Sequence, residues 1–427
     1  MPRVRSPSHA EVAAQPRAFA LLHQITASAD GELDAQALKE FVKLYGEPSE
    51  SPSEGELSFA EFAALFRRPA ISRGVTAANC IGYASRDSGG ELSAFSFDRR
   101  PVGAHDVRIQ ITHVGMCHSD LHQVKNEWGN SQFPMVPGHE IVGIVTEVGP
   151  EVSAFKPGDR AGVGCMVDSC GSCEACKETG EEQFCSKVVY TYNSKGHDGE
   201  MTQGGYSTAI VVRDTFAVHI PANLPLDAAA PLLCAGITVY SPLRHFGLDK
   251  PGMRIGVVGL GGLGHMAVKL AKAMGAHVTV ISTSAGKKEE AMKVLGADAF
   301  LVSRDPDALT VAANSLHGII DTVSAKHDLG ALIGLLRVDG KLVLVGVPEV
   351  PLELASWALI SKRITIGGSP IGGIRQTQEM LDFCGQHNIT ASIEKIPIEY
   401  ANTAFERMKA SDIRYRFVID IQGSLAL

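Results

Sequence analysis

The sequence predicts an α/β protein with three parts: a small α-helical module, a β-rich domain, and a doubly wound domain built on a parallel sheet. Three observations predict this organisation. Residues 1–74 are rich in Ala, Ser, Glu and Pro and contain none of the nine cysteines. From about residue 75 short segments alternate between apolar and polar residues, as strands with one buried face do. After Pro225 strand-like and helix-like segments alternate, and a chain of 427 residues can form two or three domains.

Composition excludes several classes of partner. The formal net charge is -8, with acidic and basic residues interspersed. Without a basic stripe we expect no binding to nucleic acid or to a membrane surface, and we expect small-molecule partners. No apolar run approaches the roughly 20 residues that span a bilayer, and residues 1–7 lack the apolar centre of a signal peptide. Since most cysteines stand at metal-ligand spacings that need reduced thiols, we expect a cytoplasmic protein.

The first 74 residues predict two short amphipathic helices, at about residues 33–45 and 59–66. The segments around Gly31 and Gly55 each resemble the middle of an EF-hand calcium loop. Ala37 stands where the first loop needs a bidentate carboxylate, and Pro52 stands where the second needs an oxygen ligand. We therefore expect a degenerate EF-hand-like module, and a solvated helical extension is the alternative.

A dense group of chemically active side chains follows the first long strand, which is expected near residues 106–111. Cys117 stands close to Ser119 and His122, and His139 and Glu140 follow after Pro137-Gly138. A thiol, an imidazole and a carboxylate can converge on one metal ion. The sequence alone leaves a further sulfur ligand open between Cys165 and Cys234.

A second cysteine group has the spacing C-x-x-C-x-x-C-x8-C. Its members are Cys170, Cys173, Cys176 and Cys185. Four thiolates can enclose one tetrahedral zinc ion and leave no position for substrate, so this site is expected to be structural. An iron-sulfur cluster is the alternative.

Residues 254–258 predict a buried strand, and residues 265–274 predict a helix that ends at Gly275. Gly259, Gly261 and Gly264 lie between them, in the pattern G-x-G-x-x-G that brings backbone close to a pyrophosphate. The next strand, residues 277–281, ends in hydroxyls and two lysines without an acid for a ribose 2′-hydroxyl. This segment favours a 2′-phosphate, and hence NADP(H).

Further strands are expected at residues 318–323 and 341–346, with a helix at 329–336 between them. A helix at 377–387 and a strand at 415–420 close the chain, and we assign them to the first large domain. The expected division is therefore residues 1–74, 75–233, 234–371, and 372–427 as a return to the second part.

These motifs, in this order, resemble the zinc-dependent medium-chain alcohol dehydrogenases, and within them the cinnamyl alcohol dehydrogenase family. The resemblance covers about residues 77–420. The segments that carry it are residues 115–122, 137–140, 170–185, 203–206, 230–243, 259–265 and 412–417. It implies a GroES-like β-rich catalytic domain, a Rossmann domain that binds NADP(H), and two zinc ions per chain.

The resemblance also implies roles for individual residues. By position Cys234 becomes the third ligand of a catalytic zinc, with Cys117 and His139, and Glu140 is either a fourth ligand or a neighbour of the ligands. Ser119 and His122 are expected to move the proton. The residues implied in cofactor binding are Ser119, Gly259, Leu260, Gly261, Gly262, Leu263, Gly264, Ser282, Thr283, Ser284, Lys287, Lys288, Thr322, Gly346, Ser369, Pro370 and Ile371.

Two expected pocket residues bear on the substrate. Trp128 and Tyr190 offer apolar surface. Tyr190 stands where lignin-forming members carry Trp, and Pro370 where they carry Phe, so dedicated monolignol specificity is not expected. Members of the family are commonly homodimers, and residues 363–366 are a candidate interface edge.

The sequence therefore predicts an NADP(H)-dependent zinc alcohol dehydrogenase that interconverts aromatic (cinnamyl-type) or medium-chain aldehydes and primary alcohols. One alternative is a polyol dehydrogenase that uses NAD. The other is a non-catalytic regulatory protein in which the N-terminal module is the functional part.

Overall fold

The computed structural model describes residues 78–425. The EF-hand-like module expected over residues 1–74 lies outside the described residues, so it stays a prediction. Among the described residues no single helix is long and apolar enough to cross a membrane. One bent pair of helices, Leu226–Leu233 with Ala235–His245, has the length and apolar composition of a membrane span.

Residues 254–368 contain a six-stranded parallel sheet, in the order β12-β11-β10-β13-β14-β15. Its strands are β10 (Arg254–Val258), β11 (His277–Ser282), β12 (Ala299–Val302), β13 (Leu316–Asp321), β14 (Leu336–Leu344) and β15 (Thr365–Gly368). The order reverses between β10 and β13, which is the arrangement of a doubly wound dinucleotide-binding fold.

Two apolar clusters cover the opposite faces of this sheet. Val257 and Ile320 belong to a cluster with α7 (Ala235–His245) and α8 (Gly262–Ala273), whereas their neighbours Val258 and Ile319 belong to a cluster with α10 (Leu329–Leu335). Successive residues of a strand point to opposite faces, so strands buried on both faces are apolar throughout. The remaining short helices beside this sheet are η5 (Ala285–Lys287), η6 (Glu290–Val294), α9 (Pro306–Val311) and α11 (Ser356–Ile360).

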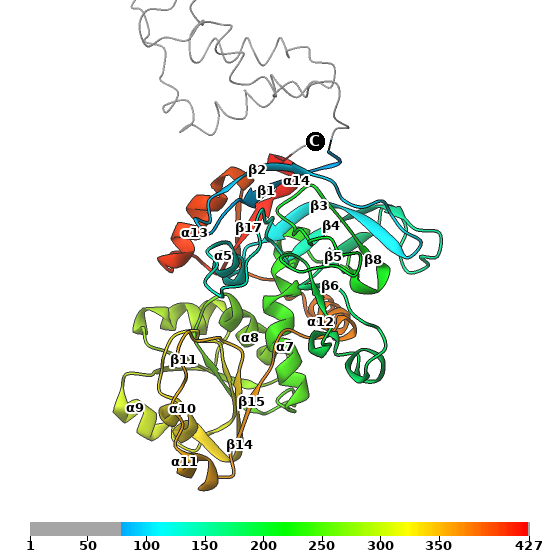
Figure 1. Cartoon of the computed structure of the whole chain (residues 1–427). Coiled ribbons are helices and arrows are strands. Elements are labelled where there is room, and N and C mark those ends of the chain that lie inside the picture. The colour runs from blue at the N-terminus through cyan, green and yellow to red at the C-terminus, as the bar shows by residue number, and fades with distance from the viewer. Residues whose placement is uncertain (1–77, 426–427) are drawn as a thin grey trace, which may run out of the picture. The chain divides into compact units, whose positions relative to one another are not determined.

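A seven-stranded sheet forms the β-rich part, with the order β16-β17-β3-β4-β5-β9 and β8 paired to β3. Its strands are β3 (Asp106–Gly115), β4 (Ile141–Val148), β5 (Arg160–Val163), β8 (Ala209–Arg213), β9 (Val218–His219), β16 (Ile393–Ile396) and β17 (Arg416–Asp420). β17 pairs antiparallel with β3, so the end of the chain returns beside its first long strand, as Figure 1 shows.

Smaller elements surround this sheet. Two more pairs of strands are β1 (Cys80–Ser85) with β2 (Leu92–Phe97), and β6 (Met166–Asp168) with β7 (Val189–Tyr190). The helices are α5 (His118–Val124), η1 (Ala175–Thr179), η2 (Glu182–Phe184), η3 (Asp214–Phe216), α6 (Leu226–Ala229), η4 (Ala230–Leu233), α12 (Ile374–His387), η7 (Ile398–Tyr400), α13 (Ala401–Lys409) and α14 (Ile421–Ser424).

Some element ends differ from those expected. α8 begins at Gly262 rather than at residue 265, because the last glycines of the loop form its first turn. α12 begins at Ile374 rather than at residue 377, and its first N–H groups include that of Ile374, which donates to Glu182. The strand expected at residues 341–346 begins five residues earlier as β14, directly after α10.

Candidate metal centres and cofactor site

Four buried side chains lie together with their ligand atoms within 4.8 Å of one another: Cys117, His139, Glu140 and Cys234. Cys117 immediately precedes α5, His139 and Glu140 immediately precede β4, and Cys234 lies between η4 and α7. The structure thus brings together donors from three separate stretches of the chain. Two sulfurs, one imidazole nitrogen and one carboxylate are a donor set that suits zinc.

Two glycines make room for this group. Gly138 has a φ of 104°, and a Cβ placed there would lie 2.5 Å from the ring of Tyr206. A Cβ at Gly115 would lie 1.9 Å from Glu140 Oε2. Larger residues at these positions would displace Tyr206 or the carboxylate of Glu140, so the glycines belong to the architecture of the site.

Asp120, which the sequence analysis did not single out, contacts two of the candidate ligands, Cys117 and His139, and holds them in place. Its carboxylate is fully buried and accepts hydrogen bonds from the backbone N–H of Cys117 (2.9 Å) and Gly138 (3.1 Å) and from the hydroxyl of Tyr206 (3.2 Å). Its Oδ1 lies 3.2 Å from Nδ1 of His139. Because that contact fixes the Nδ1–H tautomer, Nε2 of His139 is left free as a ligand atom.

Arg416, on β17, lies beside the fourth member of the group. Its Nη2 is 2.9 Å from Glu140 Oε1, and both side chains are buried. The contact is an ion pair without hydrogen-bond geometry, since neither carboxylate oxygen of Glu140 has a hydrogen-bond partner. Burial raises the pKa of Glu140 to about 8, against the opposing charge of Arg416. A buried carboxylate with two unpartnered oxygens next to two thiols fits a bound cation.

Cys165, the other sulfur that the sequence left open, is not a member of this group of four. It is half-buried in the loop between β5 and β6. Its thiol lies beside Cys234, and this contact lowers the pKa of Cys165. The thiol of Cys165 therefore neighbours the site, while the compact set of four contains Cys234.

The second cysteine group also lies together, with the ligand atoms of Cys170, Cys173, Cys176 and Cys185 within 4.8 Å of one another. Gly171, with a φ of 63°, turns the chain so that the backbone N–H groups of Ser172 and Cys173 point at Cys170 Sγ, at 3.5 and 3.3 Å. These donors lower the pKa of Cys170 to about 5. The arrangement fits a four-thiolate zinc site without an open position.

The residues expected to move a proton lie along α5. Ser119 Oγ is 3.6 Å from Cys117 Sγ. One turn further, Nδ1 of His122 contacts the carboxylate of Glu127, and the His122 ring lies 5.2 Å from that of Trp128. Glu127 was not predicted from the sequence. Its carboxylate orients the imidazole, and Trp128, 47% exposed, lies against the same ring.

The predicted cofactor residues lie where the parallel strands end. Gly259 to Gly261 connect β10 to α8, and Gly262 to Gly264 form the first turn of α8. Ser282 ends β11, Thr322 follows β13, Gly346 follows β14 and Ser369 follows β15. A Cβ at Gly264 would lie 2.2 Å from the Gly259 carbonyl oxygen, and one at Gly346 would lie 2.4 Å from that of Val323. In doubly wound folds the dinucleotide binds in the crevice at the carboxyl ends of the parallel strands, beside the point at which the strand order reverses.

The segment after β11 approaches the glycine loop directly. Ser284 precedes η5, and Lys287 Nζ donates to the carbonyl oxygen of Leu260 at 3.1 Å. Thr283, Ser284 and Lys288 are exposed beside it, with their hydroxyls and charge accessible. This places hydroxyls and a lysine at the position where a dinucleotide carries its 2′ group.

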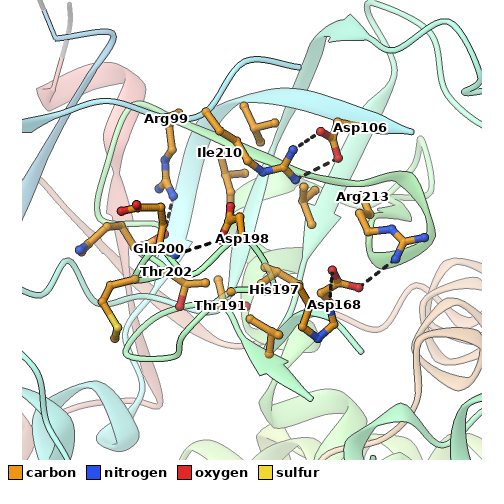
Figure 2. Close-up of a pocket in the computed structure, with 18 of the residues that line it drawn as sticks. Arg99, Asp106, Asp168, Thr191, His197, Asp198, Glu200, Thr202, Ile210 and Arg213 are labelled. Carbon is orange, nitrogen blue, oxygen red and sulfur yellow. Dashed lines mark hydrogen bonds and ion pairs between the residues drawn. The ribbon is translucent and has the colours of Figure 1, made fainter. Parts of the chain in front are cut away.

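A cavity of about 780 Å³ lies elsewhere, lined in part by residues of the segments 97–101 and 196–203. None of the predicted site residues lines it. Figure 2 shows that its charged residues pair with one another: Asp168 contacts both His197 (3.3 Å) and Arg213 (3.1 Å). Tyr190, expected in the substrate pocket, is 47% exposed at the end of β7.

Together, a buried S₂NO metal group, a four-thiolate group and a dinucleotide fold define the class of a metal-dependent dehydrogenase. The alcohol dehydrogenase GroES-like domain matches residues 103–222, and the zinc-binding dehydrogenase family matches residues 262–386. The chain belongs to the zinc-dependent medium-chain alcohol dehydrogenases, in the cinnamyl alcohol dehydrogenase family.

Individual relatives agree with this family. A probable mannitol dehydrogenase of Fragaria ananassa is 62% identical over 344 residues, which cover 81% of this chain and 96% of the relative. Cinnamyl alcohol dehydrogenase 8 of Arabidopsis thaliana is 60% identical, with coverages of 81% and 96%. A cinnamyl alcohol dehydrogenase structure from Sorghum bicolor is 53% identical with a TM-score of 0.79, covering 81% and 98%. One from Helicobacter pylori, complexed with NADP(H), is 42% identical with a TM-score of 0.76, covering 82% and 100%.

Proposed function

We propose that the chain interconverts aldehydes and primary alcohols by hydride transfer with NADP(H), at a zinc ion held by Cys117, His139 and Cys234. The observation that carries this proposal is the position of Arg416. It contacts Glu140 of the metal group, and its Nη1 would lie 3.0 Å from a Cβ on Gly262 of the glycine loop. The metal group and the dinucleotide loop are therefore separated by one side chain, as hydride transfer to a metal-bound substrate requires.

A bound zinc ion supplies a Lewis acid for the substrate oxygen, and NADPH supplies the hydride. The chain supplies the rest. Cys117, His139 and Cys234 hold the metal, Asp120 orients His139, and Glu140 lies behind the ligands or joins them. Ser119 gives the proton that the forming alcohol needs, and His122 replaces it from solvent while Glu127 orients the His122 ring.

The test compares zinc content and turnover in Cys117→Ser with those in Cys384→Ala. Cys384 is a buried thiol that contacts Met380 and lies outside both cysteine groups, so it is the matched control. We expect Cys117→Ser to retain the zinc of the four-cysteine group, to lose the other, and to lose at least about 10³-fold in NADPH-dependent aldehyde reduction. Full activity and unchanged zinc content in this variant would contradict the proposal.

A second candidate activity is polyol oxidation. It is favoured by relatives named mannitol dehydrogenase, such as that of Petroselinum crispum, which is 60% identical over 334 residues. The discriminating measurement is kcat/KM for mannitol with NAD⁺ and NADP⁺ against kcat/KM for cinnamyl-type and medium-chain aldehydes with NADPH. We expect the aldehydes with NADPH to be preferred, because the segment after β11 offers hydroxyls and Lys287 rather than an acid.

We also propose that two copies pair through the edge of the six-stranded sheet. β15 is an edge strand, and the neighbouring segment exposes Val347 (71%), Trp357 (72%) and Ile360 (67%). Large exposed apolar residues beside an unpaired edge favour an interface between copies. Trp357→Lys should shift the mass measured by sedimentation equilibrium from dimer to monomer. The control Val311→Lys, at an exposed apolar residue of α9, should leave the mass unchanged.

We propose that the protein is located in the cytoplasm. Four half-buried or buried free thiols in one group favour a reducing compartment such as the cytoplasm. Fractionation of cells that produce the full chain tests this directly.

A further inference from the structure

His265 has no assigned role in the reaction, yet it is fully buried at the first turn of α8, directly after the glycine loop. Its Nδ1 lies 3.2 Å from the carbonyl oxygen of Gly261, and its Nε2 lies 3.2 Å from the backbone nitrogen of Ser392. A carbonyl needs a donor and an N–H needs an acceptor, so the ring must be a neutral imidazole with its proton on Nδ1. One side chain therefore joins the dinucleotide loop to the segment before β16.

A second contact joins the same imidazole to Tyr415, which immediately precedes β17. The ring of His265 stacks on that of Tyr415, with centroids 4.7 Å apart and planes inclined by 8°. The backbone N–H of Tyr415 donates to the carbonyl oxygen of Ser392 at 3.1 Å. His265, Ser392 and Tyr415 thus form a closed set of contacts, and the next residue along the chain is Arg416.

Arg416 continues the path to the metal group. Its guanidinium lies 2.9 Å from Glu140, whose carboxylate is within 4.8 Å of the other candidate ligands. Lys269, one turn after His265 on α8, strengthens the same junction by donating to the carbonyl oxygen of Thr390 at 2.8 Å and to Ser392 Oγ at 3.1 Å. The glycine loop is therefore connected to Glu140 through the contacts of His265, the backbone from Tyr415 to Arg416, and the Arg416–Glu140 ion pair.

We propose that His265 is a positioning residue that ties the glycine loop to the start of β17, so that cofactor binding alters the placement of Arg416 and Glu140 at the metal. This deepens the proposed function, on which it rests. The neutral state that the role needs is supported by burial and by the charge of Lys269, which lower the pKa of His265 to about 3. His265 itself therefore stays neutral at neutral pH.

The test uses the full chain with Co²⁺ in place of zinc, because cobalt gives a visible spectrum that reports on its ligands. We measure the Kd of NADPH by fluorescence and the change in the cobalt spectrum when NADPH is added. His265→Phe keeps a ring against Tyr415 but removes both hydrogen bonds. We expect it to bind two metal ions, to bind NADPH about tenfold more weakly, and to lose the NADPH-induced spectral change.

Two further variants separate the two hydrogen bonds of His265, and they test the proposal if His265→Phe does not fold. His265→Asn can keep the donor toward Gly261, and His265→Gln can keep the acceptor toward Ser392. We expect both to lose the spectral change, with the smaller loss of NADPH affinity in His265→Asn. The matched control is His317→Phe. His317 also accepts from a backbone N–H, that of Arg254 at 3.0 Å, but it lies near the amino end of β13, whereas the cofactor residues follow the carboxyl ends of the strands.

A folded His265 variant with wild-type Kd for NADPH and a full spectral change would overturn the proposal, and so would a wild-type cobalt spectrum that does not respond to NADPH. Aldehyde turnover by the wild-type zinc enzyme is measured separately. Absence of turnover with an intact, His265-dependent spectral change would refute the proposed function and leave the positioning role standing.

Discussion

Asp120 Oδ1 lies 3.2 Å from His139 Nδ1, and the same carboxylate accepts the backbone N–H of Cys117, so one buried acid orients two of the candidate ligands. Partners that hold a ligand in place contribute strongly to metal affinity. We expect Asp120→Asn to weaken binding of the catalytic zinc by about 10- to 100-fold.

Competition with a chelator, followed by counting the zinc that remains, measures this effect. The four-cysteine group serves as an internal control, because its ligands do not contact Asp120 and should release zinc at the wild-type rate. Equal retention of both ions in Asp120→Asn would show that the carboxylate has no part in holding the metal.

Glu127 orients His122, and its replacement by Gln keeps the size of the side chain while removing its charge. We expect kcat for aldehyde reduction to fall by about 10²-fold, with little change in the KM of NADPH, since general acid-base assistance is worth about 10² to 10⁴. Steady-state kinetics across pH measures this. Glu178, an exposed acid of η1, provides the control variant Glu178→Gln. A pH profile of kcat identical to that of the wild type would exclude Glu127 from the proton path.

The choice between NADP(H) and NAD(H) should depend on the segment after β11. Ser284→Asp would place a carboxylate where a 2′-phosphate is expected, and would offer an acceptor to a 2′-hydroxyl instead. We expect the ratio of kcat/KM for NADPH to that for NADH to fall by at least about tenfold, roughly the effect of one charge-assisted contact. Because both cofactors are measured on the same variant, a general loss of activity cancels in the ratio. An unchanged ratio would mean that the 2′ group of the cofactor does not bind beside Ser284.

His265 also predicts how stability depends on pH. Its pKa is about 3 in the folded protein and about 6.5 in an unfolded chain. Between these values only the unfolded state binds the proton, so stability falls as pH decreases from 6.5 toward 3, by up to about 1.4 kcal/mol per pH unit. The decrease is absent above pH 6.5, where the imidazole is neutral in both states.

Urea unfolding of the wild type and of His265→Asn, each at pH 7.5 and 5.5, measures this contribution. The wild type should lose more stability than the variant between the two values. Comparison of the same two proteins cancels the effects of zinc loss and of other titrating groups. An equal loss in both would mean that His265 does not stay neutral in the folded state.

The sequence predicted much of this site because its determinants are local. The cysteines of the four-cysteine group lie within residues 170–185. The glycine loop lies between a strand and a helix, both of which apolar periodicity predicts. Cys234 was different, since the residues alone left the choice between it and Cys165 open, and the family resemblance favoured Cys234, in agreement with its place at the junction into the nucleotide-binding domain. The structure separates the two through the turn between η4 and α7, which has no local signature of metal binding.

The residues that sequence reasoning missed act over long distances in the chain. Arg416 meets Glu140 only because β17 pairs with β3, and nothing near residue 416 indicates that pairing. His265 meets Ser392 for the same kind of reason. Asp120 had a local signal, because an acid three residues after Cys117 at the start of a helix can accept the backbone N–H of Cys117. Glu127 had none that distinguishes it from a solvated acid.

The distribution of the two donor sets along the chain has a consequence for biosynthesis. The cysteines of the four-cysteine group occupy one short stretch. The other set needs residues 117, 139 and 140 together with residue 234, which immediately precedes the helix leading into the next domain. A growing chain can therefore capture its first zinc ion as soon as residue 185 has emerged from the ribosome, but the second must wait until the junction has been made. Zinc shortage would consequently produce folded, inactive molecules that carry one ion, and late addition of the metal should restore their activity.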